Sequence, residues 1–192
     1  RDCLLSRGLG DVYKRQEIKI PIGEMTPQGI INLINMMHSK QYLINRASGR
    51  ECISITDTLT DALAERAFEN TEEAVRFITE QGGCRGVSFA DGNIDFTGFP
   101  HTDSMMEYCR LASAIVKKAS EQKRVNPKQT IEENEKYYMR VWLVRIGLGG
   151  KDGKDTRKVF LSRLKGHTAF RTEEDKEKWK ERNSKKSTEP AE

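Results

Sequence analysis

Alternation of apolar and polar residues marks the segments of this chain that we expect to form β-strands. Isoleucine occupies every second position of residues 17–22, which is the pattern of a half-buried strand. Farther along, two alternating stretches flank Asp91-Gly92-Asn93, a sequence suited to the tight turn of a hairpin. The pattern therefore predicts strands near residues 17–22, 52–55, 85–90 and 93–98.

Apolar residues spaced three and four positions apart predict helices between and after these strands. The clearest stripes lie in residues 30–37 and 105–119, and a separate helical stretch around residues 42–44 ends at Gly49. Shorter stripes predict further helices over residues 57–67, 70–81, 131–146, 155–165 and from residue 172 onward.

Capping signatures indicate where four of the helices begin, one of them at Thr172. Thr26 precedes Pro27, which suits an N-cap followed by proline at the first helical position. Asn70 and Thr130 are each followed three residues later by a glutamate, the spacing of a capping box. Thr130 is therefore expected to start the helix over residues 131–146.

Together these elements predict an α+β protein with a small antiparallel sheet packed by helices, followed by a basic helical subdomain. The sequence Val125-Asn126-Pro127 breaks the preceding helix, and we place the boundary of the subdomain there. The predicted organisation is a non-native segment over 1–16, an α+β domain over 17–126, the basic subdomain over 127–182 and a disordered tail over 183–192.

The first sixteen residues do not resemble the start of a folded domain. Residues 11–16, with the sequence DVYKRQ, can be read as the translation of a sequencing adapter. We therefore interpret residues 1–16 as an artefact, with a native basic arm as the alternative. The apolar stretch Cys3-Leu4-Leu5 is too short for a secretory signal.

The cysteines favour a reducing environment. Four are present in the chain, and setting aside Cys3 leaves Cys52, Cys84 and Cys109 at irregular spacing. An odd number without a Cys-x-x-Cys pair predicts buried, reduced thiols and a cytoplasmic location. Because no cysteine or histidine pair has ligand spacing, we expect no metal site and no cofactor.

Two motifs invite a catalytic or phosphate-binding interpretation. The glycine-rich stretch at residues 147–156 lacks the glycine and hydroxyl positions of a P-loop, so a flexible connection is expected there. His101 and Asp103 could form a base and its orienting carboxylate, but no nucleophile motif accompanies them. We expect no catalytic residue and no enzymatic activity, with a nonstandard site around this pair and a cysteine as an open alternative.

Charge is distributed unevenly along the chain. Of its 33 basic and 29 acidic residues, residues 17–116 carry a net charge of −6, whereas residues 117–192 carry +8. No apolar run approaches the ~20 residues of a membrane span, so no membrane partner is expected. The most basic stretch contains nine basic residues against two aspartates: Arg140, Arg145, Lys151, Lys154, Arg157, Lys158, Arg163, Lys165 and Arg171.

Such a stretch suits contacts with a phosphate backbone, giving salt-dependent and largely sequence-independent affinity. We therefore predict that these nine residues bind DNA or RNA. The alternatives are an acidic protein partner, docking on the chain's own acidic half, or a solvated face without a partner.

Four segments together are similar to small proteins catalogued as virulence-related, which occur in mobile elements of Gram-positive bacteria. The segments are EIKIPIGEMTPQG at 17–29, GFPHTD at 98–103, RVWLVRIG at 140–147 and LKGHTAF at 164–170. The resemblance implies a genomic setting and no catalytic residues. It favours an accessory protein of a mobile element that binds nucleic acid, or alternatively a virulence-associated module that binds an acidic protein.

Overall fold

The computed structural model describes residues 18–100, 102–131 and 133–186, and it has the predicted α+β architecture. The predicted artefact at 1–16 lies outside the described residues. Strands β1 (Ile18–Pro21), β4 (Ser88–Ala90) and β5 (Asn93–Phe96) form an antiparallel sheet in the order β1-β5-β4. Strands β2 (Ser54–Ile55) and β3 (Cys84–Arg85) form a second, two-stranded antiparallel sheet, so the predicted strands are divided between two small sheets.

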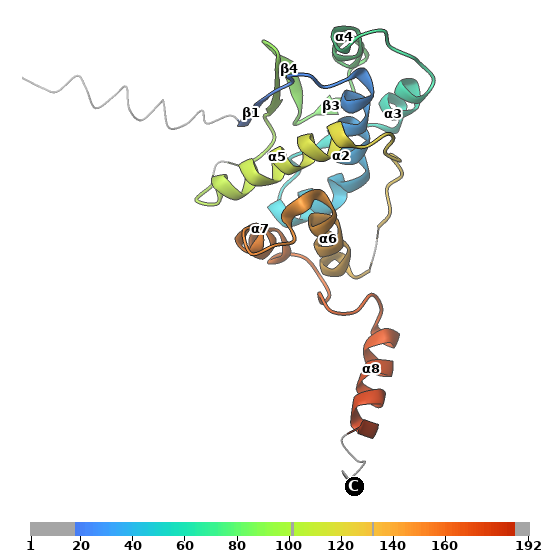
Figure 1. Ribbon diagram of the computed structural model, residues 1–192, viewed down its shortest axis with the longest axis vertical. Coiled ribbons are helices and arrows are strands. Elements are labelled where there is room, and N and C mark those ends of the chain that lie inside the picture. The colour runs from blue at the N-terminus through green and yellow to red at the C-terminus, as the bar shows by residue number, and fades with distance from the viewer. Residues whose placement is uncertain (1–17, 101, 132, 187–192) are drawn as a thin grey trace, which may run out of the picture.

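Helix α2 (Pro27–Ser48) runs through the centre of the molecule (Figure 1). It begins at Thr26, whose hydroxyl accepts a hydrogen bond from the amide of Gly29 at 3.2 Å, as the sequence predicts. It ends at Gly49, which has the left-handed φ of 73° typical of a helix C-terminus. The two helical stretches expected before Gly49 form one continuous helix, because no helix-breaking residue separates them.

The remaining helices surround α2 and the larger sheet (Figure 1). Helix α5 packs along α2, α7 packs against both of them, and α6 packs against α7. Helix α8 extends away from these elements. The helices are α3 (Asp57–Ala64), α4 (Thr71–Gln81), α5 (Met105–Glu121), α6 (Glu135–Leu143), α7 (Lys154–Leu161) and α8 (Glu173–Lys186).

The predicted helix over residues 131–146 was wrong at its start and in its last turn. Asn134 caps α6, with its side-chain oxygen accepting from the amide of Tyr137 at 3.2 Å, whereas Thr130 makes no such cap. The described residues just before α6 have no regular structure. After Leu143 the chain forms a π-helical turn, η2 (Val144–Leu148).

The end of the chain also differs from its prediction. Thr172 caps α8 as expected, because its hydroxyl accepts from the amide of Asp175 at 3.2 Å. The helix then continues to Lys186, so residues 183–186 are helical rather than part of the predicted tail. Residues 187–192 lie outside the described part. None of the helices described is both long and apolar enough to cross a bilayer.

Helix α2 carries a row of amide side chains that bind the backbone of irregular segments. The side chain of Gln41 both donates to the carbonyl of Ile55 at 3.0 Å and accepts from its amide at 2.7 Å. Asn45 pairs in the same way with both backbone groups of Ile53 and also accepts from the amide of Cys52 at 2.9 Å. Strand β2 pairs only with β3 in its sheet, and these side chains of α2 bind the backbone groups on and just before β2.

The same row continues toward the start of α2 and holds the segment after α5. Asn32 donates to the carbonyl of Gln122 at 2.6 Å and accepts from the amide of Val125 at 3.0 Å. His38 is 2% exposed, and its Nδ1 donates to the carbonyl of Pro127 at 2.7 Å. The segment therefore lies against α2 although it has no strand or helix of its own.

Residues on both sides of the predicted boundary at 126/127 share one hydrophobic core. Leu33, Ile34 and Leu111 come from the first part. Buried residues from the second part join them, so the boundary marks a change in charge within a continuous core. These residues are Met139, Trp142, Leu143, Ile146, Phe160 and Leu164.

Two glycines allow three backbone segments to cross closely beside β2. The amide of Gly98 donates to the carbonyl of Gly86 at 3.0 Å, and a Cβ at either position would overlap the carbonyl oxygen of Cys52. Gly86 also has a φ of 90°, which side chains rarely adopt. The crossing therefore depends on the absence of side chains at both positions.

We predict that Gly98→Ala lowers the free energy of unfolding by about 3 kcal/mol, because the added methyl group meets backbone that cannot rotate away. Gly150→Ala is the matched control, since a Cβ there meets nothing within 4 Å and its φ is not positive. It should be neutral or slightly stabilising. Urea unfolding measures both changes, and equal stability of the two variants would contradict the close crossing.

Asn45→Ala should lower the free energy of unfolding by about 2–4 kcal/mol, because three backbone groups of Cys52 and Ile53 lose their partner. Ser39→Ala is the control on the same helix, as its hydroxyl donates only to the carbonyl of Met36 within α2. It should change stability by less than about 0.5 kcal/mol in the same urea measurement. A small effect of Asn45→Ala would show that the amide row does not hold β2.

Candidate nucleic-acid interface

The nine basic residues predicted to contact phosphate do not share one cavity, because Arg145, Lys158 and Arg171 line three different ones. Two of the nine serve the fold through hydrogen bonds to backbone carbonyls. Arg157 donates to the carbonyls of Leu148 and Gly150, which closes the glycine-rich loop from within. Arg163 donates to the carbonyl of Ser48 at 2.9 Å and so satisfies the last turn of α2.

Lys158 lies among carboxylates. It lines a cavity of about 390 Å³ together with Asp103, Glu107 and Asp155. No cysteine belongs to the described lining of this cavity, and His101 lies outside the described residues. Among the described residues, this cavity therefore brings no cysteine to Asp103, as the alternative enzymatic site would require. Its three carboxylates disfavour a bound phosphate.

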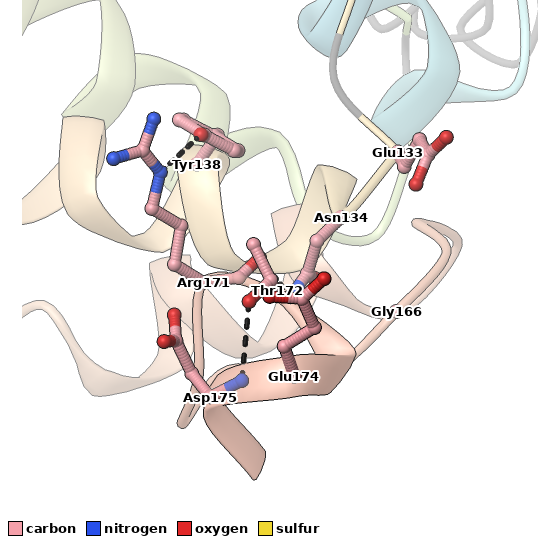
Figure 2. A pocket seen from close by; sticks show the side chains of 8 residues that line it. All are labelled: Glu133, Asn134, Tyr138, Gly166, Arg171, Thr172, Glu174 and Asp175. Atoms are coloured by element: carbon pink, nitrogen blue, oxygen red, sulfur yellow. Dashed lines mark hydrogen bonds between the residues drawn. The ribbon is translucent and has the colours of Figure 1, made fainter. Parts of the chain in front are cut away.

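Arg171 lies in another acidic setting, at the start of α8 (Figure 2). Its Nε donates to the hydroxyl of Tyr138 at 2.9 Å, and the guanidinium faces the tyrosine ring. The cavity of about 760 Å³ around this pair is also lined by Glu133, Glu174 and Asp175. Arg171 thus joins the loop after α7 to α6, with carboxylates as its neighbours.

Four further members of the nine are exposed and line neither of these cavities. They are Arg140, Lys151, Lys154 and Lys165. The interaction of these four side chains with phosphate stays a prediction.

Arg145 is the member of the nine that lies in a basic recess. The recess has a volume of about 230 Å³ and is lined by one cation from each of four segments. Lys40 comes from α2, Lys118 from α5, Lys128 from the segment after α5, and Arg145 from η2. Its described lining contains no carboxylate.

A second recess of about 320 Å³ adjoins the first, and the two share Lys118, Arg145 and Ile146. It adds Lys117 and Glu121, and the carboxylate of Glu121 pairs with Lys118 at 3.5 Å. We call the two recesses together the basic groove, lined by Lys40, Lys117, Lys118, Lys128 and Arg145.

Local structure explains how Arg145 reaches this groove. The chain kinks within η2, directly after α6. Ile146 is buried in the core there, while Arg145 beside it is exposed. The turn contains Gly147, whose φ of 99° lets the chain leave the helix.

Lys128 is placed by the amide row of α2. Pro127 is bonded to His38, and the side chain of Asn126 accepts from the amide of Lys128 at 2.9 Å, so the backbone turns at this point. These hydrogen bonds hold the segment against α2, where Lys128 lines the same recess as Arg145 of η2. The groove therefore depends on hydrogen bonds between residues about 90 positions apart.

Glu135 joins the elements that carry the groove and its surroundings. It accepts from the hydroxyl of Tyr42 at 2.8 Å and the amide of Lys165 at 2.9 Å, and it pairs with Arg46 at 3.4 Å. Burial by itself would raise the pKa of Glu135, but these donors together outweigh burial and lower it. The carboxylate is therefore charged at neutral pH and holds α6 to α2.

Sequence reasoning missed four of the five groove cations. The sequence does contain a second basic cluster, because residues 117–128 include five basic residues and one acidic residue. The basic residues at the end of α5 also suit the negative end of a helix dipole, and the boundary at Pro127 separated them from Arg145. Nothing in the sequence pattern placed Lys40 beside them.

Burial disfavours the thiolate form of two of the described cysteines. Burial raises the pKa of the Cys84 thiol to about 11 and also raises the pKa of Cys52. Both thiols are therefore protonated at neutral pH. Within the described residues, no three histidine, cysteine, aspartate or glutamate side chains gather in a group that could hold a metal ion.

Comparison with known proteins adds no assignment. No family model, curated protein or solved structure matches the chain.

Glu135→Gln should lower the free energy of unfolding at neutral pH by about 1–3 kcal/mol, because it removes a charge that three donors stabilise. Since folding lowers the pKa of Glu135, its contribution is complete above the usual carboxyl range and disappears as the pH falls through the lowered value. Urea unfolding over a pH series should therefore show the two proteins converging in acid.

Glu80→Gln is the control, because Glu80 is exposed and its side chain has no partner among the described residues. It should leave both stability and its pH dependence unchanged. A constant difference between wild type and Glu135→Gln at every pH would show that charge at this position is unimportant.

Proposed function

We propose that this protein is a non-enzymatic nucleic-acid-binding protein whose basic groove contacts the phosphate backbone. The observation that carries the proposal is the convergence of Lys40, Lys118, Lys128 and Arg145 on one recess with no carboxylate in its described lining. Like charges held close together repel one another, and an anion in the recess would relieve that repulsion.

The chemistry of the groove suits phosphate. Lysine supplies mobile point charges, and the guanidinium of Arg145 can donate two parallel hydrogen bonds to one phosphate. The side chains of Arg145 and Lys128 have no hydrogen-bond or ion-pair partner among the described residues, so both can turn toward a ligand. The adjoining recess continues the positive charge through Lys117.

We also propose that the protein is an accessory protein of a mobile element of a Gram-positive bacterium. This proposal depends on the resemblance of the four segments described above. An acidic protein would meet the same cations, and the experiment below separates the two partners. Affinity for a phosphate backbone falls steeply with salt because bound counterions are released.

We predict that Lys128→Gln/Arg145→Gln weakens binding of a labelled oligonucleotide by about ten-fold or more at physiological salt. The slope of log affinity against log salt should also become shallower, by about 0.7–0.9 for each phosphate that the variant no longer neutralises. Fluorescence anisotropy over a salt series, with single-stranded and duplex oligonucleotides tested separately, measures both changes.

Lys151→Gln/Lys154→Gln is the matched control, because it removes the same charge from exposed side chains outside the groove. It should keep most of the affinity and the salt slope. If the control abolished binding and the groove variant kept it, the result would favour the nine-residue stretch over the groove. Absence of binding to either oligonucleotide by wild type at low salt would overturn the proposal.

A further inference from the structure

We infer that the basic groove takes single-stranded nucleic acid in preference to duplex, an inference that depends on the proposed function. It follows from the size of the two adjoining recesses and from the apolar residues that line the first recess beside its cations.

The two recesses are small and adjoin each other. Their volumes, about 230 Å³ and about 320 Å³, lie near or below the lower end of the ~300–1,000 Å³ range that holds a drug-sized ligand. Each therefore suits one small unit, such as a base or a sugar with its phosphate. Lys118 and Arg145 line both recesses and so can contact the phosphate that joins two such units.

Apolar side chains line the first recess beside its cations. Met36, Trp142 and Ile146 line the first recess, and all three are mostly buried in the core. A phosphate alone would use only the cations around the recess, whereas an unpaired base could also contact these apolar groups. Proteins that bind single strands without sequence preference combine cations with aromatic side chains in this way.

A duplex cannot use the recesses without cost. Its bases are stacked and paired inside the helix, so one of them would have to be flipped out to enter. An intact duplex would therefore reach only the cations at the edge of the groove. A single strand already has unpaired bases and a flexible backbone that can follow the two adjoining recesses.

Trp142 provides a reporter inside the groove. The chain contains two tryptophans, and the other, Trp179, is 53% exposed on α8. Trp179→Phe leaves Trp142 as the single tryptophan and keeps an aromatic ring beside Phe170. We expect a single strand of about 20 nucleotides to quench the emission of this variant.

The same strand annealed to its complement should bind at least about ten-fold more weakly and quench less. Lys128→Gln/Arg145→Gln in the Trp179→Phe background should abolish the quenching, while Lys151→Gln/Lys154→Gln should keep it. Circular dichroism and thermal unfolding verify that each variant is folded. Poly-glutamate of equal charge, added as a competitor, should displace the strand only weakly.

Three results would overturn the inference. Equal or tighter binding of duplex would refute the strand preference while leaving nucleic-acid binding intact. Binding of the single strand without any change in Trp142 emission would place it outside the groove. Displacement by poly-glutamate as effective as by unlabelled strand would identify an acidic protein as the better partner.

Discussion

The structure depends on the row of buried and half-buried amide and imidazole side chains along α2. Two segments, the buried one around residues 52–55 and the half-exposed one around residues 122–127, lack enough neighbouring strands to complete their hydrogen bonds. An amide side chain offers both a donor and an acceptor, so Gln41 and Asn45 can each replace the edge of a strand. An apolar side chain at either position would leave buried backbone groups unpaired, at a cost of about 1–3 kcal/mol each.

This constraint also creates the groove. Because Asn32 and His38 hold the segment after α5 against α2, Lys128 is brought to the same recess as Arg145, which follows it by 17 positions in the chain. Four cations then line one recess, and repulsion between like charges opposes folding. Local conflicts of this kind are expected at functional sites, where stability is exchanged for the ability to bind.

Arginines in the most basic stretch illustrate two uses of the same side chain. Arg157 and Arg163 bond to backbone carbonyls, which stabilises the glycine-rich loop and the C-terminus of α2. The second interaction also places a cation at the negative end of a long helix, which is favourable. The side chain of Arg145 has no such partner among the described residues. All three arginines carry the same charge. The backbone carbonyls within reach of each side chain decide whether it stabilises the fold or stays available for a ligand.

The sequence by itself determined the local elements and the class of fold. Thr26, Asn70 and Thr172 cap helices as their neighbours predict, and the hairpin turns at Asp91 and Gly92, because capping and turn formation involve only a few adjacent residues. The tertiary structure decided the start of α6, the division of the strands between two sheets, and the position of the groove. Each of these depends on interactions between residues far apart in the chain, and the spacing of residues along a sequence carries no direct record of such interactions.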